Sequence, residues 1–440
     1  KMGAIAVPLA MLFGVEALQY RLQNSGAKAL LMSHASRDNV AEVRPSLDAL
    51  SAVFCIDGKL DFAPHLHDAS AGMPDTFDAV DSKPDDPCLM IYTSGTTGPP
   101  KGALHGHRVL LGHLPGVQFA HEFLPQPGDL MWTPSDWAWA GGLLNALLPA
   151  LYYGVPVLAY RFQKFDPVFA WDLMAEYGVR NCFVPPTALK LMRASTPTDT
   201  DRLKLRTLFS GGEAVGQALQ EWAEASLGMR INEVYGQTEC NLVLESCNKL
   251  GVWKAGAIGK PVPGHTVAIV DDAGNPLPDG EAGNIAVQRP DPVMFLEYWG
   301  RPEATKDKYA GDWLLTGDQG FRDEEGYFHF VGRDDDVITS SGYRIGPGEI
   351  EDCLSRHPAV KLAAAVGIPD PVRTEIVKAF IVLNPGYEPS PELEEDIRAH
   401  VRNRLSAHEY PRTFEFRDEL PLTTTGKVIR RLLRDEASSN

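Results

Sequence analysis

Cysteine is scarce in this sequence, and no two cysteines form a closely spaced pair. The six cysteines are scattered over 440 residues without a C-x-x-C motif, so the sequence suggests neither a disulfide framework nor a zinc site. We interpret His105 and His107 as loop histidines, because no further metal-ligand candidates stand close to them in the sequence. This cysteine usage favours a reducing, cytoplasmic setting.

Positive charge is in deficit as well. The chain has 41 Lys and Arg against 58 Asp and Glu, a formal net charge of −17, and such a surface repels nucleic acid and anionic membranes. The first residues, K-M-G-A-I-A-V-P-L, also lack the basic flank, long apolar run and cleavage site of a signal peptide. We therefore expect no nucleic-acid partner, and any phosphate binding must be local.

Long uncharged runs are rare, and the longest candidate covers residues 140–160. Its 21 residues would suffice for a membrane helix. Glycine and proline recur within it, at Gly141, Gly142, Pro149 and Pro156, and these residues interrupt helices. We expect a buried helix followed by a strand, and no membrane span.

The apolar runs that the sequence does contain are short and alternate with helix-like segments. Residues 29–32, 53–56 and 88–92 are runs of this kind, and residues 181–190 read as a strand followed by a helix that a proline begins. The alternation predicts a parallel sheet covered by helices. Since 440 residues exceed one ordinary domain, we expect an α/β fold with more than one folded unit.

A loop rich in glycine and hydroxyl groups follows the run at residues 88–92. The stretch M-I-Y-T-S-G-T-T-G-P-P-K-G, residues 90–102, passes from a strand-like end into small residues and a lysine. Glycine lets backbone N–H groups approach a ligand and hydroxyls add donors, so such a loop can wrap polyphosphate oxygens. It is not a Walker motif, whose lysine follows a glycine. The candidate phosphate-binding residues are Thr93, Ser94, Gly95, Thr96, Thr97, Gly98 and Lys101.

This stretch resembles the phosphate-loop signature of the adenylate-forming (AMP-binding) superfamily, which includes acyl-CoA synthetases, peptide-synthetase adenylation domains and firefly-type luciferases. The resemblance implies ATP, Mg²⁺ and CoA as cofactors. It implies a large N-terminal domain of parallel-sheet subdomains with a small β-rich subdomain, followed by a small mobile α+β C-terminal domain. The first residue matches a point that roughly a hundred family residues normally precede, so we expect an N-terminal segment to be missing from this chain.

Two further stretches resemble the family's nucleotide-binding motifs. L-F-S-G-G-E-A, residues 208–214, reads as a strand entering a glycine turn, and N-E-V-Y-G-Q-T-E covers residues 232–239. The resemblance implies that an aromatic lies against the purine, a threonine contacts the α-phosphate, a carboxylate holds Mg²⁺ and an aspartate binds the ribose hydroxyls. The implied nucleotide-binding residues are Gly212, Glu213, Ala214, Glu233, Tyr235, Gly236, Asp318 and Arg333, and the implied catalytic and metal-binding pair is Thr238 and Glu239.

The stretch T-P-S-D-W-A-W-A-G-G, residues 133–142, is a candidate wall for the acyl group. Its Asp136, Trp139 and Gly142 resemble the D-x-[GA]-W-x-x-G pattern of small- and medium-chain acyl-CoA synthetases, although paired tryptophans can also be plain core filling. Gly236 stands where acetyl-CoA synthetases carry the second tryptophan of W-W-Q-T-E. The glycine implies a deeper pocket, which favours a medium-chain, branched or aromatic acid over acetate.

The C-terminal quarter carries the last set of resemblances. Asp335 in R-D-D-D matches the hinge of the mobile domain, although three aspartates could also form a solvated loop or bind a divalent ion. We therefore expect an N-terminal AMP-binding domain at 1–334, with a β-rich subdomain over about 256–333, and a mobile domain at 335–440. The other matches are Gly342 and Tyr343 for the pantetheine channel, Arg344 for a phosphate-contacting arginine and Lys427 for the catalytic lysine.

Together these residues predict an acid–thiol ligase. A carboxylic acid and Mg·ATP would give an acyl-adenylate and pyrophosphate, and CoA would then give acyl-CoA and AMP at the same site after the domain rotates. The alternatives are an adenylation enzyme that loads another acceptor and an inactive nucleotide-binding scaffold. The frame around Lys427 also resembles one used by lysine acetyltransferases, so its acetylation is a further hypothesis. The acid and the oligomeric state, a homodimer included, are not determined by the sequence.

Overall fold

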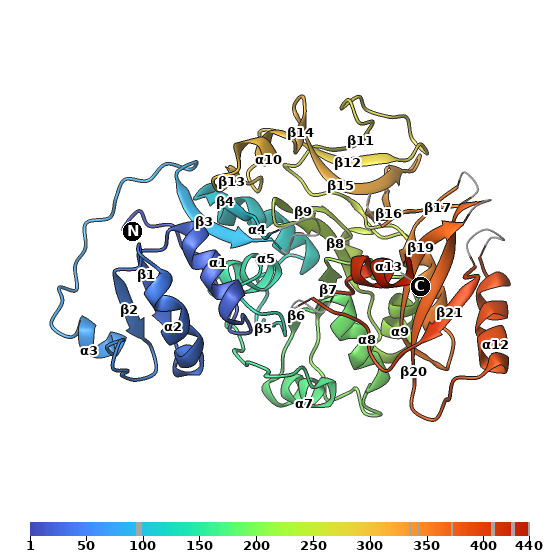
Figure 1. The fold of residues 1–440 in the computed structure, drawn as a ribbon, viewed down its shortest axis with the longest axis horizontal. Helices are drawn as coiled ribbons and strands as arrows, with labels where there is room; N and C mark the ends of the chain where they lie inside the picture. Colours follow the sequence, from blue (N-terminus) through green and yellow to red (C-terminus); the bar gives the residue numbers. More distant parts are fainter. Residues whose placement is uncertain are drawn as a thin grey trace. The chain divides into compact units, whose positions relative to one another are not determined.

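The computed structural model describes residues 1–93, 99–333, 336–340, 343–370, 373–405, 410–423 and 427–438, without the side chains at 339, 343, 344, 349 and 438 (Figure 1). The chain divides into two compact units. The first comprises residues 1–109, 137–139 and 295–305, and the second the remainder. In the described part of the chain, every helix is too short or too polar to cross a membrane.

The first unit holds two small sheets. One is a parallel pair, β1 and β2, against which α1 and α2 pack their apolar side chains. The other is antiparallel and joins β3 to β4 and β4 to β13. The bounds are α1 Val15–Ser25, β1 Ala29–Met32, α2 Arg37–Val43, β2 Ala52–Cys55, α3 Leu66–Ser70, β3 Pro87–Tyr92, β4 Gly102–Gly106, β13 Glu297–Tyr298 and α10 Pro302–Lys306, whose last residue belongs to the second unit.

The prediction of a parallel sheet from three apolar runs was right for two of them. β1 and β2 are parallel, whereas β3 pairs antiparallel with β4 in the other sheet. The nine residues between β3 and β4 are too few for the crossover that a parallel pair requires. β4 also contains His105, which is 1% exposed, so this histidine lies in a strand and not in a loop as expected, while His107 lies in the following turn.

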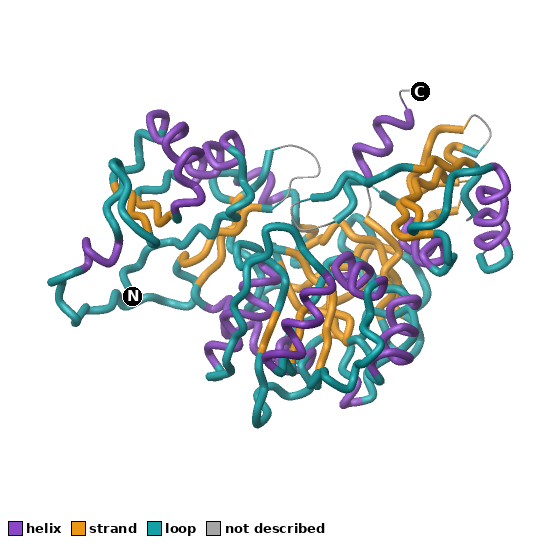
Figure 2. The backbone as a smooth tube through the Cα atoms, turned by 90° about the horizontal axis from the view of Figure 1, so that it is seen from below, coloured by secondary structure: helices purple, strands orange, loops and turns teal. Residues whose placement is uncertain are grey.

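The second unit is built around a six-stranded sheet in the order β10-β9-β8-β7-β6-β5. β5 to β8 are parallel, as predicted, and β9 and β10 are antiparallel. Successive residues of a strand point to opposite faces of the sheet, so Cys182 and Phe183 lie in two different buried clusters. Helices cover both faces of the sheet (Figure 2). The bounds are β5 Met131–Trp132, β6 Asn181–Phe183, β7 Thr207–Gly211, β8 Asn232–Gln237, β9 Cys240–Glu245 and β10 Lys260–Pro261.

Helices α7, α8 and α9 cover one face of this sheet, and α4, η3 and α6 cover the other. The uncharged run at 140–160 is interrupted as predicted, because its helical part ends at Tyr152. The strand expected after it is reduced to a single bridge between Val157 and Met131. The bounds are α4 Arg108–Ala120, α5 Ala140–Gly142, the π-helical turn η3 Leu143–Leu147, α6 Leu148–Tyr152, α7 Pro167–Tyr177, α8 Pro186–Ala194 and α9 Gln217–Leu227.

One carboxyl group is buried in this core without a hydrogen bond. Glu245 of β9 lies opposite Val234 of β8, so both side chains point toward α4. Glu245 is 2% exposed, and neither carboxyl oxygen has a hydrogen-bond partner among the described residues. Burial raises the pKa of Glu245 well above its ordinary value, because a low-dielectric site disfavours the charged form.

The protein is expected to lose stability as the pH rises above the ordinary glutamate pKa. The folded state keeps a proton on Glu245 that the unfolded state releases, so the free energy of unfolding falls with pH between the two pKa values, by up to about 1.4 kcal/mol per pH unit. Glu245→Gln should remove this component, which urea unfolding at several pH values above about 5 measures. The exposed Glu176→Gln on α7 is the control. An unchanged pH slope in Glu245→Gln would contradict the assignment.

The remaining elements form a β-rich part and a small α+β part, as predicted. In the β-rich part the order is β11-β12-β15-β14, with β16 on β15. In the C-terminal part α11 and α12 contribute to the core on one face of the sheet and α13 to the core on the other. The bounds are β11 Val267–Val270, β12 Gly283–Gln288, β14 Tyr309–Ala310, β15 Trp313–Arg322, β16 Phe328–Arg333, β17 Ile338–Ser340, β18 Tyr343–Ile345, α11 Pro347–Ser355, β19 Val360–Asp370, β20 Thr374–Leu383, α12 Pro391–Arg402, β21 Thr413–Phe416 and α13 Arg430–Ser438.

Candidate active site

Thr238 and Glu239 form the two-residue turn between β8 and β9. Glu239 is 7% exposed. The side-chain amide of the preceding Gln237 donates through Nε2 to the Thr316 carbonyl at 2.9 Å. Its Oε1 accepts a hydrogen bond from Lys308 Nζ at 3.1 Å. The turn is therefore fixed to the neighbouring β-rich part, and it holds a hydroxyl and a carboxylate side by side.

Three of the residues predicted to bind the nucleotide, Tyr235, Asp318 and Arg333, lie close together. The Tyr235 hydroxyl donates to Asp318 Oδ2 at 2.7 Å, and Arg333 Nε lies 3.9 Å from Asp318 Oδ1 across the β15–β16 pair. Burial raises the pKa of Asp318, and the Arg333 charge opposes this effect. Burial also raises the pKa of Tyr235 well above its ordinary value, and the Asp318 carboxylate adds to the shift. Tyr235 thus stays a neutral donor that orients the carboxylate.

The loop after β7 brings Gly212 and Glu213 to the same region. Gly212 has φ +89°, a conformation that favours glycine. The Glu213 carboxylate accepts a hydrogen bond from the Thr187 hydroxyl. Thr187 Oγ1 lies 3.0 Å from Glu213 Oε2 and 3.2 Å from Oε1. Glu233 of β8 supports this loop, because its carboxylate accepts from the Val215 N–H at 3.1 Å. Burial raises the pKa of Glu233 to about 7.

Lys427 reaches this loop from the C-terminal part of the chain. Its Nζ lies 3.5 Å from the position that a Cβ would take at Gly212. Its backbone N–H donates to Thr423 Oγ1 at 3.0 Å, and its carbonyl accepts from the Thr423 N–H at 2.7 Å. Although the residue is exposed, desolvation by the surrounding protein lowers the pKa of Lys427, and the charges of Glu213 and Asp318 oppose that shift. The lysine ammonium and the residues predicted to bind the nucleotide therefore lie in one region.

An ion-pair network anchors the segment that carries Lys427. Arg430 binds the Glu351 carboxylate through both Nε and Nη2, at 2.9 and 2.7 Å, and lies 3.4 Å from Asp336. The side chain of Glu351 is 8% exposed. Asp336 also accepts from Arg434 at 2.7 Å. One of the three consecutive aspartates is thus paired with arginines and is not simply solvated.

The first unit holds three further predicted residues, Thr93, Lys101 and Trp139. The Thr93 N–H donates to the Lys101 carbonyl at 2.9 Å, and Lys101 Nζ lies 4.6 Å from the centre of the Tyr298 ring. Trp139 packs edge-on against Phe13 with ring centres 5.8 Å apart. Outside the described residues lie Ser94, Gly95, Thr96, Thr97, Gly98, Asp335 and Gly342, together with the side chains of Tyr343 and Arg344.

Comparison with known proteins places these motifs in one family. Residues 1–299 match the AMP-binding enzyme model, and residues 349–427 match the model of the AMP-binding enzyme C-terminal domain. The chain belongs to the AMP-binding enzyme family. It is 35% identical to acetyl-coenzyme A synthetase of Bacillus subtilis (strain 168), with 99% of this chain and 76% of that protein covered. It is also 35% identical to the mitochondrial acyl-coenzyme A synthetase ACSM2B of Homo sapiens, with 95% and 73% covered.

A solved structure agrees with this assignment. The anthranilate CoA ligase AuaEII in complex with anthranoyl-AMP matches with a TM-score of 0.90 and 29% identity, covering 99% of this chain and 83% of that one. The α/β fold class and the acyl-CoA synthetase class predicted from the sequence are thereby confirmed. An acyl-CoA synthetase of this family uses ATP, Mg²⁺ and CoA to convert an acid to its acyl-CoA in two steps. The hairpin-turn pair Thr238 and Glu239 fits Mg²⁺, which prefers oxygen ligands.

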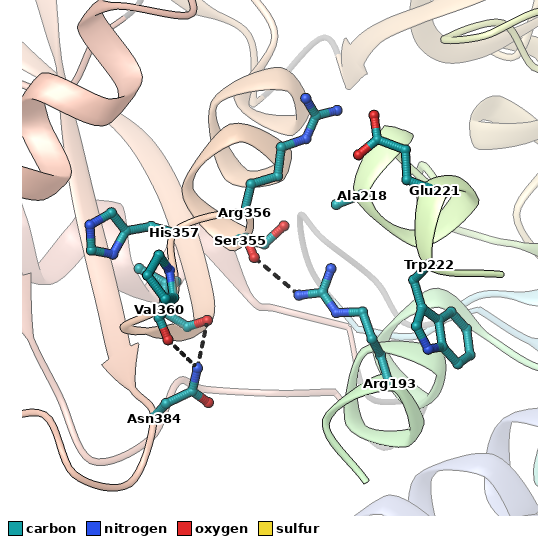
Figure 3. Close-up of a pocket in the computed structure, with 10 residues that line it drawn as sticks. Arg193, Ala218, Glu221, Trp222, Ser355, Arg356, His357, Val360 and Asn384 are labelled. Atoms are coloured by element: carbon teal, nitrogen blue, oxygen red, sulfur yellow. Dashed lines mark hydrogen bonds between the residues drawn. The ribbon is translucent and has the colours of Figure 1, made fainter. Parts of the chain in front are cut away.

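The AMP-binding enzyme also contains contacts that sequence reasoning missed. Asp352 of α11 accepts from the Ala218 N–H at 3.1 Å and so caps the N-terminus of α9. Arg193 of α8 reaches toward α11 and donates to the Ser355 carbonyl at 3.0 Å, beside an open cavity of about 490 Å³ (Figure 3). Because 134 to 162 residues separate these partners, the sequence offered no local signal for them.

Gly236 of the enzyme has a packing role that the pocket prediction did not include. A Cβ at this position would lie 2.5 Å from the Leu242 backbone nitrogen and 2.6 Å from Asn241 Cα. Neither neighbour is a flexible side chain, so the β8–β9 hairpin itself would have to move. The glycine is thus required by the close approach of two strands, whatever the depth of the acyl pocket.

We expect Gly236→Ala to lower the free energy of unfolding by about 1–3 kcal/mol, the usual cost of overpacking. Gly348→Ala is the matched control, because Gly348 lies in α11 of the same unit with no atom within 4 Å of its added Cβ. Denaturant unfolding of both variants measures the difference. Equal stabilities would show that the hairpin accommodates the methyl group.

Proposed function

We propose that the enzyme joins a medium-chain, branched or aromatic carboxylic acid to CoA through an acyl-adenylate. The observation that carries this proposal is the position of Lys427, whose ammonium lies beside Gly212 and interacts electrostatically with Glu213 and Asp318. A cation at this point can stabilise the negative charge that develops at the α-phosphate. The assignment of each site residue to its role is part of the proposal.

In the first step an oxygen of the carboxylate attacks the α-phosphorus of ATP, and the bond to pyrophosphate breaks. Lys427 offsets the charge on the carboxylate and the α-phosphate, while Asp318, oriented by Tyr235, accepts hydrogen bonds from the ribose hydroxyls. Thr238 contacts the α-phosphate. Glu239 would hold Mg²⁺, which would supply positive charge to neutralise the phosphates. The protein mainly positions the reactants and compensates charge, as phosphoryl transfer generally requires.

In the second step the CoA sulfur attacks the carbonyl carbon of the acyl-adenylate, AMP leaves and the thiol proton passes to solvent. We propose that rotation at Asp335 withdraws Lys427 and brings the segment around Gly342 to the site. The contacts of Asp352 with Ala218 and of Arg193 with Ser355 accompany the arrangement with Lys427 at Gly212. The proposal requires that they break for the second step.

A buried aromatic pair beside the candidate acyl wall supports the choice of acid. Phe183 and Phe209, which are 5% and 0% exposed, are stacked with ring centres 4.9 Å apart. A Cβ at Gly141, within the stretch that resembles the acyl wall, would lie 2.7 Å from Phe183 Cε1, so only glycine lets the ring approach so closely. Among proteins of similar structure are an anthranilate CoA ligase and a benzoate CoA ligase. An acid with an alkyl or aryl tail is the substrate class that a pocket beside such an apolar wall favours.

Pyrophosphate release over a panel of acids tests the proposal. The panel runs from acetate through longer straight-chain and branched acids to benzoate, each with Mg·ATP and with or without CoA. We expect release to peak on a non-acetate acid and to accelerate with CoA. If CoA does not change the rate of pyrophosphate release, another acyl acceptor would be favoured. If no acid gives pyrophosphate release although the chain binds ATP, the inactive scaffold would be favoured.

The proposal extends to the setting of the enzyme. A cytoplasmic location is supported by six free cysteines, which suit a reducing compartment. Acetylation of Lys427 is supported by the exposure of this residue, and it would remove the charge that the first step needs. Unchanged activity after complete acetylation would exclude that switch. A homodimer is a further hypothesis, which a solution mass measurement would decide.

A further inference from the structure

Three side chains able to bind a metal meet in the first unit, outside the residues assigned to the nucleotide and the acid. Cys55 is the last residue of β2, Asp57 follows it by two residues, and His34 stands two residues after the end of β1. β1 and β2 are parallel, with Met32 opposite Cys55. The carboxyl ends of parallel strands meet at one edge of a sheet, which is a common place for ligands.

The distances among the three side chains suit one metal ion. Cys55 Sγ lies 3.5 Å from His34 Nδ1 and 3.1 Å from Asp57 Oδ1, and the last two atoms are 3.3 Å apart. A tetrahedral zinc ion with ordinary bond lengths holds such atoms about 3.3–3.6 Å from one another. The side chains therefore need to move by only a few tenths of an ångström. They form the one cluster of three such ligands in the described part of the chain.

Local packing holds this arrangement in place. A Cβ at Gly58 would lie 2.6 Å from His34 Cε1, so the imidazole ring occupies space that only a glycine leaves. The backbone N–H of His34 donates to Asp57 Oδ1 at 2.8 Å and orients the carboxylate. Cys55 is 0% exposed, whereas the His34 and Asp57 side chains are 46% and 50% exposed. Water can thus complete the coordination from the solvent side.

We propose that His34, Cys55 and Asp57 bind one Zn²⁺ ion with water as the fourth ligand. Thiolate and imidazole select zinc-like ions over Mg²⁺ and Ca²⁺, which prefer oxygen ligands. When the Zn–S bond forms, the S–H bond of Cys55 breaks and the proton leaves to solvent. The ion ties the segment after β1 to the end of β2. Sequence analysis missed the site because 21 and 23 residues separate His34 from its partners.

Cobalt and zinc titrations of the full chain, first treated with a chelator, test the site. We expect one Co²⁺ per chain, an absorption band from thiolate-to-cobalt charge transfer, displacement of Co²⁺ by Zn²⁺ and a melting temperature that rises with added Zn²⁺. Cys55→Ser should abolish the band. Cys88→Ser, which changes the other cysteine of the same unit, should keep it. His34→Gln and Asp57→Asn should each weaken binding by about tenfold or more.

Two results would overturn the proposal. Absence of the charge-transfer band in the wild-type chain would mean that the three groups are joined by hydrogen bonds alone. An undiminished band in Cys55→Ser would place the metal elsewhere. Should Cys55→Ser fail to fold, His34→Gln carries the same test, since its half-exposed ring contributes little to the core. Unchanged cobalt affinity in that variant would equally exclude the site.

Discussion

Lys427→Met is expected to slow acyl-adenylate formation by about a hundredfold or more, the effect typical of losing one group that stabilises transition-state charge. Methionine keeps an unbranched side chain and removes the positive charge. In the structure that charge lies at Gly212 and interacts with Glu213 and Asp318. Since negative charge develops only in the first step at this position, conversion of preformed acyl-adenylate and CoA to acyl-CoA should be largely retained.

The two half-reactions must be measured separately to test this expectation. Pyrophosphate release reports the first, and acyl-CoA formation from synthetic acyl-adenylate reports the second. Lys361→Met, at an exposed position of β19, is the control for loss of a lysine from the C-terminal part. Desolvation lowers the pKa of Lys427. As the pH rises, the wild-type first step should therefore begin to slow at a lower pH than that at which an ordinary lysine loses its proton. Equal losses in both half-reactions of Lys427→Met would argue for misfolding instead.

Local signals were enough to predict the elements that present the motifs. The strand and the proline-started helix predicted over residues 181–190 are present as β6 and α8. The run at 208–214 forms β7 and then a glycine turn. The reason is that strand ends, turns and helix starts depend on neighbouring residues. The antiparallel pairing of β3 with β4 was not predicted, although the connection of nine residues between them is too short for a parallel crossover.

Contacts between distant segments could not be predicted from the sequence. Thr187 meets Glu213 across 26 residues, and Asp352 meets Ala218 across 134. A threonine, an aspartate or an arginine in an unremarkable stretch shows no periodicity or spacing that indicates its partner. Only packing of whole elements brings such groups within hydrogen-bond distance. These contacts nevertheless support the residues that the motifs identified, so the site is more extensive than its sequence signatures.

Arg430→Met is expected to lower the free energy of unfolding by about 3–5 kcal/mol, because removing one member of a buried ion pair leaves the other charge without compensation. The residue left behind is Glu351, whose side chain is 8% exposed and retains one backbone donor, the Ala365 N–H. Asp336 keeps its contact with Arg434. Arg431→Met, at the next and exposed position of α13, is the matched control and should change stability little.

The double variant Arg430→Met with Glu351→Leu separates charge burial from the positioning of Lys427. Two apolar side chains in place of a buried pair often restore stability or raise it, so denaturant unfolding should show recovery relative to Arg430→Met alone. The acyl-adenylate step should recover less, since the segment that carries Lys427 has lost its ionic link to α11. If stability and the first half-reaction return together to wild-type values, Arg430 acts only through folding, and a positioning role for it would be wrong.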